Sequence, residues 1–263
     1  MQSIPPIQIH AATHRAKVLV IFYTLYGHVY QLAKEVQLGL EKNPNLTVEM
    51  YQIPETIPEE VLQSIGAPPK PNVPIITLEK LQEADGILFG IPTRYGAMPS
   101  QYHAFWETTL PLWTDGALHH KLAGTFFSTS CQRGGHETTG YTFITNLTHH
   151  GMIYVPLGFT SPHLTDNTEV IGGSPWGAGT ITNGDGSRPA SQKEREIARL
   201  QGEHFGQLVL QVTRGKCDDE SLYTPTNSTY STNYTLNSHL AVREKKLPKK
   251  RSFLKSFKKL FSH

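Results

Sequence analysis

The chain has 263 residues, of which 38% are hydrophobic and 10% aromatic, a composition that suits one globular domain and excludes wholesale disorder and an integral membrane protein. Its formal net charge of +2 divides unevenly, because residues 243–263 carry +8 and the rest of the chain −6; a mildly acidic body excludes nucleic acid as the main partner. Two cysteines are too few for a disulfide scaffold, and residues 1–15 contain no apolar segment of signal-peptide length, so we expect a cytoplasmic protein.

Short apolar strands and amphipathic helices alternate along the chain, after a predicted flexible tail over residues 1–15. The first strand is predicted over 17–23, and in the helix that follows Val29, Leu32, Ala33, Val36 and Leu40 share one face. The remaining predicted elements, in chain order, are a strand over 46–53, a proline-rich connection, a helix over 78–84, a strand over 86–91, a helix over 100–108, a strand over 121–127, a helix over 137–149, a strand over 152–155, a glycine-rich segment over 158–190 and a helix over 191–212.

This alternation of strands and helices is typical of an α/β fold, a doubly wound parallel sheet of five strands. In such sheets ligands bind outside the carboxyl ends of the strands, where the strand order reverses. Three strand ends carry turns rich in Gly, Ser, Thr or Arg, at 24–28, 92–96 and 128–135. We therefore expect these three turns to converge on one ligand crevice.

The first of these turns, over 24–29, joins a buried strand to a helix and predicts an anion site. Free backbone N–H groups and the positive end of the helix dipole attract a negative charge at such a turn. The segment lacks the Gly-x-Gly-x-x-Gly pattern of dinucleotide folds and the Gly-Lys-Ser/Thr of a P-loop. Hydroxyl and backbone donors favour the phosphate of a mononucleotide, although any turn between strand and helix needs a small residue and a cap.

An ordered series of motifs extends through most of the chain: Tyr26-Gly27-His28, Phe89 to Gly96, Leu112-Trp113, Gly134-Gly135 with Glu137-Thr138-Thr139, His149 to Met152, Gly172 to Thr180, and Gly184 to Arg188. On these motifs the chain resembles the WrbA family of flavodoxin-like NAD(P)H:quinone oxidoreductases, and its fungal branch in particular. The resemblance covers residues 16–213, which we predict to be one flavodoxin-like domain.

The resemblance implies non-covalently bound FMN held by three loops and a histidine. The loop for the FMN phosphate is the turn over 24–29, and two further loops are expected to contact the flavin. The implied cofactor-binding residues are Thr24, Leu25, Tyr26, Gly27, His28, Val29, Thr93, Arg94, Tyr95, Ser128, Thr129, Ser130, Cys131, Gln132, Arg133 and His149.

The resemblance also implies an activity and an assembly. The family passes a hydride from NAD(P)H to flavin and then reduces a quinone by two electrons, a reaction that protects from oxidative stress, and it works as a homo-oligomer, a dimer or a tetramer. Trp113, His149 and Arg94 are the implied catalytic residues. The tryptophan that Trp113 matches forms part of the wall of the substrate site in a neighbouring subunit. Arg94 offsets negative charge on reduced flavin, and Tyr95 and Trp113 offer apolar walls to a flat quinone. A surface ion pair is the simpler interpretation of Arg94, but its place in this loop favours the functional role.

Several departures from the family pattern fall at the flavin site. Ser130 and Arg133 replace glycines, which introduces strain if those positions require a positive φ. Leu110-Pro111 replaces a Gly-Gly pair before Trp113, and Ala97 replaces an Asn. The alternative function is therefore a flavin-free protein of the same fold that acts as a membrane-associated scaffold. We favour the enzyme, because the family's principal site residues are retained.

Metal and thiol chemistry have weaker support in the sequence. The pair His119-His120 has no Cys or carboxylate partners at ligand spacing, so no metal site is predicted. Cys131 beside Arg133 is either a redox-sensing thiol or simply a small residue, and we favour the small residue.

Beyond the domain, residues 214–244 predict a disordered linker rich in Ser, Thr, Asn and Tyr. Residues 245–263 predict a basic amphipathic tail, since Phe253, Leu254, Phe257, Leu260 and Phe261 share one face of a helix with lysines opposite. Such helices bind anionic membranes, which predicts peripheral attachment to the cytoplasmic face of the plasma membrane. A nuclear-import-like signal and a solvated tail are the alternatives.

Overall fold

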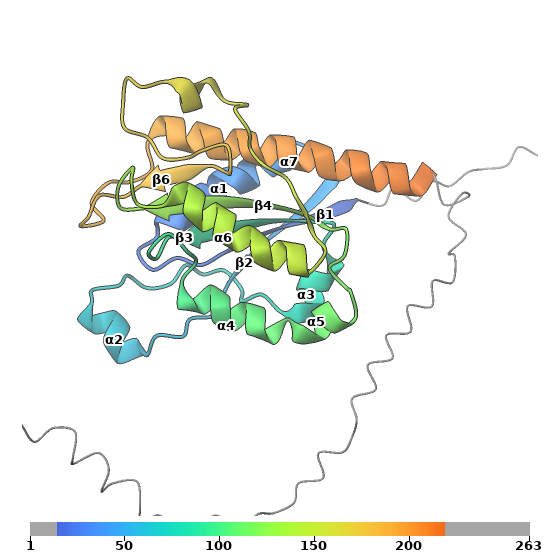
Figure 1. The fold of residues 1–263 in the computed structure, drawn as a ribbon, viewed down its shortest axis with the longest axis horizontal. Helices are drawn as coiled ribbons and strands as arrows, with labels where there is room; N and C mark the ends of the chain where they lie inside the picture. Colours follow the sequence, from blue (N-terminus) through green and yellow to red (C-terminus); the bar gives the residue numbers. More distant parts are fainter. Residues whose placement is uncertain (1–14, 219–263) are drawn as a thin grey trace, which may run out of the picture. The chain divides into compact units, whose positions relative to one another are not determined.

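The computed structural model describes residues 15–218, with the side chains of 215–218 excepted (Figure 1). Residues 1–14 and 219–263, which include almost all of the predicted N-terminal tail, most of the predicted linker and the basic tail, lie outside the described residues. The elements are β1 (Ala16–Phe22), α1 (His28–Glu41), β2 (Leu46–Gln52), α2 (Glu59–Ser64), α3 (Leu78–Glu83), β3 (Gly86–Pro92), α4 (Ser100–Thr108), α5 (Leu110–Thr114), β4 (Leu122–Thr129), α6 (His136–His149), β5 (Ile153–Tyr154), the 3-10 turn η1 (Pro162–Thr165), β6 (Gly179–Ile181) and α7 (Gln192–Asp218).

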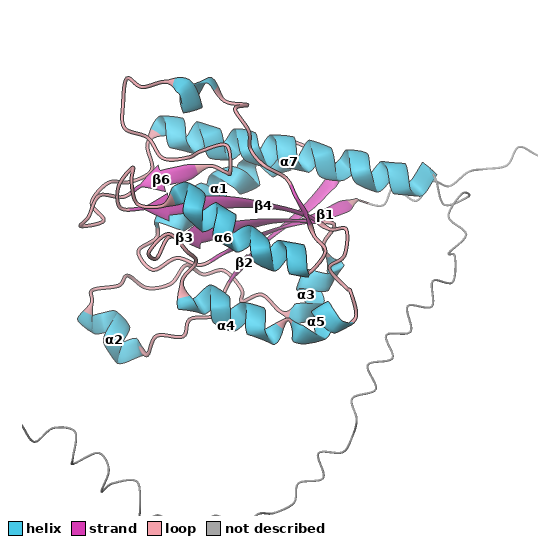
Figure 2. Ribbon diagram, viewed as in Figure 1, coloured by secondary structure: helices cyan, strands magenta, loops and turns pink. Residues whose placement is uncertain are grey.

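A sheet flanked by helices forms the centre of the domain (Figure 2). Its strands are parallel and follow the order β2-β1-β3-β4-β5. The order reverses between β1 and β3, as in flavodoxin-like doubly wound folds, so the predicted fold class is confirmed. The fifth strand position is divided: β5 pairs with Leu122 and Ala123 at the start of β4, whereas β6 pairs with Phe127 to Thr129 at its end. Residues 155–178 are inserted between the two halves, so six strands fill the five predicted positions.

Both faces of the sheet are buried, because side chains alternate between two apolar layers. In β1, Val18 and Val20 belong to the layer covered by α1 and α7, whereas Leu19 and Ile21 belong to the layer covered by α3, α4 and α6. All five positions predicted to share the inner face of the first helix are at most 1% exposed. The continuous apolar runs of the sequence are therefore strands packed on two sides.

Helices α1 and α7 pack closely because glycines face backbone at their contact. A Cβ on Gly39 would lie 2.0 Å from the carbonyl oxygen of Arg199, and a Cβ on Gly202 would lie 2.1 Å from that of Val36. Real Cβ atoms do not approach backbone that closely, so any larger residue would push the two helices apart. These glycines determine how near α7 lies to α1.

The structure differs from the predicted elements at four short segments and one helix end. The proline-rich connection contains α2, which begins after Pro58, and α5 has Pro111 in its first turn, where proline's missing N–H is harmless. The 3-10 turn η1 and strand β6 both lie inside the segment described only as glycine-rich. Helix α7 continues to Asp218, six residues past its predicted end. Among the helices of residues 15–218, none combines the length and apolar character needed to cross a bilayer.

Candidate functional site

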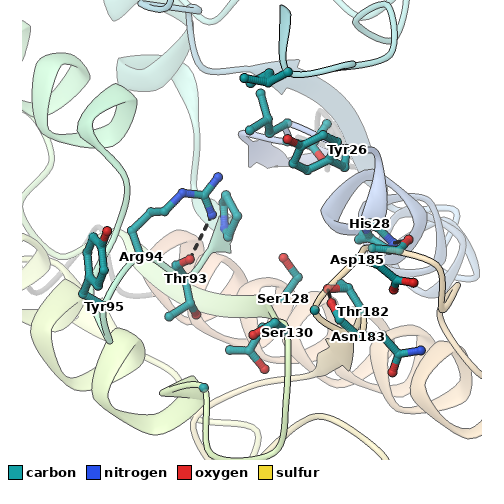
Figure 3. A pocket seen from close by; sticks show the side chains of 18 of the residues that line it. Tyr26, His28, Thr93, Arg94, Tyr95, Ser128, Ser130, Thr182, Asn183 and Asp185 are labelled. Carbon is teal, nitrogen blue, oxygen red and sulfur yellow. Dashed lines mark hydrogen bonds between the residues drawn. The ribbon is translucent and has the colours of Figure 1, made fainter. Parts of the chain in front are cut away.

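A cavity of about 600 Å³ opens at the carboxyl ends of the strands, where the loops after β1, β3, β4 and β6 meet (Figure 3). This is the edge at which the sequence predicts convergence, and the three predicted loops all contribute to it. Ten predicted site residues line the cavity: Thr24, Leu25, Tyr26, His28, Thr93, Arg94, Tyr95, Ser128, Thr129 and Ser130. Pro92 and Gly134, which lie within two of the predicted turns, line it as well, whereas Ile65, Gly66 and the segment from Thr182 to Gly186 were not predicted to line it.

The first loop is a tight turn that begins α1. Thr24 Oγ1 accepts a hydrogen bond from the Gly27 N–H at 3.0 Å, and Gly27 has φ +90 at the N-cap position, a conformation that side chains disfavour. A helix cannot satisfy its own first N–H groups, so those of α1 can donate to an anion bound at this turn. Val29 is 1% exposed and packs in the core below the turn, so it supports the loop without lining the cavity.

The second loop projects two predicted residues at the cavity mouth. Arg94 and Ala97 exchange both backbone hydrogen bonds, at 2.8 and 2.9 Å, which closes a tight turn that uses only the backbone of Ala97. Tyr95 sits at φ 53 and is fully exposed. A non-glycine residue held in the left-handed region is strained, and such strain is common at ligand sites. Arg94 Nη1 donates to the Thr93 carbonyl at 2.9 Å (Figure 3).

The third loop follows β4, and its backbone accommodates Ser130 and Arg133, which replace glycines of the family pattern, without strain. Ser128 and Thr129 are buried, whereas Ser130 and Arg133 are exposed, and neither of those two has a positive φ. The strain expected if these positions required glycine is therefore not present. Cys131 is exposed, and Gln132 and Arg133 line a separate neighbouring cavity of about 400 Å³ with the start of α6, so these three residues do not line the main cavity.

The fourth wall, from Thr182 to Gly186, is held by a buried carboxylate. Glu194 is fully buried and pairs with Arg188 Nη1 at 2.9 Å. It also accepts hydrogen bonds from Gly172 N at 2.8 Å, Thr180 Oγ1 at 2.8 Å, Ile181 N at 3.1 Å and Ser191 N at 2.7 Å. Together with a 3.0 Å contact between His28 Nε2 and the Gly186 carbonyl, these bonds fix the wall against α1. The Gly184–Arg188 motif marked this segment in the sequence, but gave it no role.

His136, the first residue of α6, links the third loop to the segment before β6. Its Nε2 lies 3.0 Å from Thr129 Oγ1, and its Nδ1 accepts from the Gly173 N–H at 3.3 Å. Burial lowers the pKa of the imidazole to about 4. At neutral pH His136 is therefore uncharged, with Nε2 as the donor to Thr129.

The depressed pKa of His136 predicts a loss of stability on mild acidification. The unfolded chain takes up this proton near pH 6.5 and the folded one only near pH 4, so the free energy of unfolding should fall across that interval, by about 3 kcal/mol in total. Urea unfolding at half-unit pH steps measures this slope. His136→Gln should flatten it, and equal slopes in the variant and the unmodified protein would contradict the assignment.

Trp113 and His149 lie away from the cavity of their own chain. Helix α6 begins beside the cavity and has 14 residues, so its last residue, His149, lies roughly 20 Å along the helix axis. The α5 segment that carries Trp113 joins the same far end, where Thr109 Oγ1 lies 2.9 Å from His150 Nε2. Both predicted residues are exposed, Trp113 to 53%. Within one chain the structure does not bring them to the other predicted site residues.

Titratable side chains do not gather into a metal centre in the part of the chain that the structure describes. No group of three or more His, Cys, Asp or Glu side chains there could hold an ion. The rings of His119 and His120 lie 4.1 Å apart and contact each other.

Known proteins are similar to this chain in sequence or in fold. The family model described as NADPH-dependent FMN reductase matches residues 16–166. NAD(P)H quinone oxidoreductase PST2 of Candida albicans is 46% identical over 75% of this chain and 98% of its own length. Quinone-oxidoreductase QR2 of Triphysaria versicolor is 49% identical over 74% of this chain and 96% of its own length.

Among solved structures, a flavodoxin described as a WrbA-like protein from Agrobacterium tumefaciens superposes with a TM-score of 0.51 at 20% identity. It covers 74% of this chain and 98% of its own, which supports the flavodoxin-like fold. The resemblance inferred from the motifs is thus confirmed by the family model and by relatives close to half identical. The chain belongs to the NADPH-dependent FMN reductase family.

Proposed function

We propose that this protein is an FMN-dependent NAD(P)H:quinone oxidoreductase that reduces quinones by two electrons. The observation that carries the proposal is the cavity at the strand ends, together with relatives of 46–49% identity that are named as quinone oxidoreductases. Its volume of about 600 Å³ falls within the range of cofactor sites. Hydroxyl and backbone donors at one end and the aromatic Tyr95 at the mouth match the phosphate and ring of FMN.

Some residues of this chain would bind FMN, and others would compensate the negative charge of the reduced cofactor. The turn over 24–29 would hold the phosphate, and the loops at 93–95 and 128–130 would hold the ring system. Bound FMN would supply the redox chemistry, by taking a hydride from NAD(P)H and passing it to the quinone. The guanidinium of Arg94 would offset the negative charge of the reduced cofactor. Tyr95, already projecting from the mouth, would offer a flat apolar surface to the substrate.

The first test is the visible absorption spectrum of the purified full-length protein after addition of FMN and removal of the excess. We expect flavin to be retained at near-equal stoichiometry and then to be bleached by NAD(P)H and reoxidised by a quinone. Failure to retain flavin at micromolar protein would favour the flavin-free scaffold instead. We do not favour that alternative, because Ser130 and Arg133 avoid the left-handed backbone region and Pro111 fits the first turn of α5.

Thr24→Val should weaken FMN binding about tenfold, because it removes the hydroxyl that accepts the Gly27 N–H and that lines the cavity. Flavin fluorescence titration measures the dissociation constant. Thr213→Val is the matched control, since that hydroxyl bonds only the Val209 carbonyl within α7. Equal affinity in the Thr24 variant and the control would argue against a phosphate site at this turn.

A homo-oligomer, a dimer or a tetramer, is part of the same proposal. Leu110 and Trp113 are 62% and 53% exposed one helical turn apart on α5, an apolar surface that a second copy would cover. Trp113 and His149, too far from their own cavity, would then reach the flavin of the neighbouring chain. The site would be complete only in the assembly.

Subunit complementation tests this assembly. Assayed at limiting FMN, a chain with Thr24→Val and a chain with Trp113→Ala and His149→Ala should each be poorly active alone. Co-expression should restore activity, because some mixed sites contain both intact halves. Sedimentation of the unmodified protein should give a mass that is a multiple of 29.3 kDa. A monomer in sedimentation, or no recovery in the mixture, would contradict the shared site.

The location of the protein is also a proposal. We expect it in the cytoplasm, with residues 245–263 attaching it to the inner face of the plasma membrane through their lysines and phenylalanines. Binding to vesicles that contain phosphatidylserine, compared between the full chain and a chain ending at residue 244, tests this attachment. Equal binding of the two would rule it out.

A further inference from the structure

A partly buried carboxylate just behind the first cavity loop is saturated with hydrogen bonds. Glu55 follows β2, and its side chain is 19% exposed. It accepts five hydrogen bonds: at Oε1 from Thr56 N at 2.9 Å, Ile57 N at 3.0 Å and Gln101 Nε2 at 3.0 Å, and at Oε2 from the Tyr23 hydroxyl at 2.8 Å and Lys70 Nζ at 2.5 Å. We call Tyr23, Glu55, Lys70 and Gln101 the Glu55 cluster.

Lys70 connects this cluster to the backbone of the first loop. Besides its ion pair with Glu55, its ammonium donates to the Thr24 carbonyl at 2.8 Å and lies over the Tyr23 ring, 4.6 Å from the centroid. Lys70 comes from the proline-rich connection, 46 residues away from Thr24 in the chain. A charged donor thus fixes the orientation of one peptide group at the start of the cavity loop.

The geometry of a peptide bond transmits this contact to the cavity. Because the bond is planar and trans, the carbonyl of Thr24 and the N–H of Leu25 point in opposite directions. Lys70 holds the carbonyl, so the N–H of Leu25 is directed away from Lys70. Leu25 lines the cavity, whereas Lys70 does not. A backbone donor directed to that side of the loop would face an anion bound at the first turn.

We propose that Lys70, anchored by Glu55, is a positioning residue that aligns the first loop for the phosphate of FMN. The inference rests on the proposed function. It gives a role to the proline-rich connection, for which the sequence offered none. Burial raises the pKa of the Glu55 carboxyl, but hydrogen bonds from Lys70, the Ile57 N–H and Tyr23 outweigh it and hold the pKa at about 2. The anchor therefore stays charged throughout the physiological range.

A positioning role and a simple charge effect predict opposite results for Glu55→Gln. If Lys70 acted only by attracting phosphate, removing the negative charge of Glu55 would strengthen FMN binding, since the nearby net charge would rise by one. If Lys70 acts by orienting the Thr24 carbonyl, loss of its anchor would weaken binding instead. The near-isosteric amide keeps the volume of the side chain, which separates the two explanations.

Dissociation constants for FMN and for riboflavin, which lacks the phosphate, provide the test. For Lys70→Met we expect FMN to bind about tenfold more weakly, with riboflavin unchanged within about twofold. Lys70→Arg should recover most of the FMN affinity, because it keeps the charge and the donors. Lys42→Met is the matched control, since Lys42 also pairs with a glutamate, Glu203, at 2.6 Å on the remote surface of α1 and α7.

The outcomes separate this inference from the proposed function. No FMN binding by the unmodified protein would contradict the proposed function itself. FMN binding by the unmodified protein with equal affinity in Lys70→Met, or tighter binding in Glu55→Gln, would overturn only the positioning role. A loss of FMN and riboflavin affinity in equal measure, or a large fall in the thermal midpoint of the flavin-free variant, would show a general structural role and overturn the inference as well.

Discussion

Replacing Glu194 by alanine should lower the free energy of unfolding by about 3–5 kcal/mol, because it leaves the guanidinium of Arg188 without its carboxylate partner. The loss extends beyond one ion pair. The N–H groups of Gly172, Ile181 and Ser191 would lose their acceptor as well, and a buried donor without a partner costs about 1–3 kcal/mol. Chemical denaturation of the flavin-free protein measures the change.

Helix α7, which carries Glu194, also carries a matched control residue. Glu196 also forms a short contact, 2.8 Å to His163 Nε2, but its side chain is 44% exposed. Glu196→Ala should change stability by less than about 1 kcal/mol, since exposed pairs contribute little. If both alanine variants unfold at the same denaturant concentration, the buried carboxylate does not hold the fourth wall in the way described above.

Gly202→Ala should destabilise the domain by about 3 kcal/mol, although intrinsic helix propensity alone favours alanine by about 1 kcal/mol. The two effects have opposite signs, so the direction of the change decides between them. The new methyl group would lie 2.1 Å from the Val36 carbonyl, and backbone cannot move aside as a side chain can. Helices α1 and α7 would have to separate, which also loosens the apolar layer below them.

Denaturation of Gly202→Ala beside Gln207→Ala, an exposed position on the same helix, isolates the effect of the contact. Gly39→Ala tests it from the other side, since its methyl would meet the Arg199 carbonyl at 2.0 Å. Unchanged or increased stability of both glycine variants would mean that the helices are less closely packed than the structure indicates.

The strands and long helices were predictable because their signal is local. In β1 and β3 a run of apolar residues is buried on both faces, and burial follows the sequence pattern directly. Strand β6 was not predictable, since it has three residues, Gly179–Ile181, and exists only because it pairs with β4 across a long insertion. Helix α5 was obscured by Pro111, which reads as a break and in fact occupies the first turn.

Three of the four cavity loops were predictable for a related reason. Each loop follows a strand that the sequence predicts. Because these strands are parallel, their carboxyl ends, and the loops that follow them, lie at the same edge of the sheet. The fourth wall follows β6 and depends on Glu194, a carboxylate in the first turn of the following helix, α7, whose partners no spacing rule identifies. The separation of Trp113 and His149 from the cavity depends on the length and direction of α6, which become informative only once the helix is placed on the sheet.

The division of the fifth strand between β5 and β6 also makes β6 easier to open than the centre of the sheet. Closing the loop over residues 155–178 costs about 3 kcal/mol of chain entropy. The three-residue pairing of β6 with β4 and the hydrogen bonds to Glu194 offset this cost. The amide of Ile181 should therefore exchange with solvent through a local opening, while those of β1 exchange only when the whole domain unfolds. The edge that forms the ligand wall thus has its own opening equilibrium, which a bound ligand can suppress without altering the centre of the sheet.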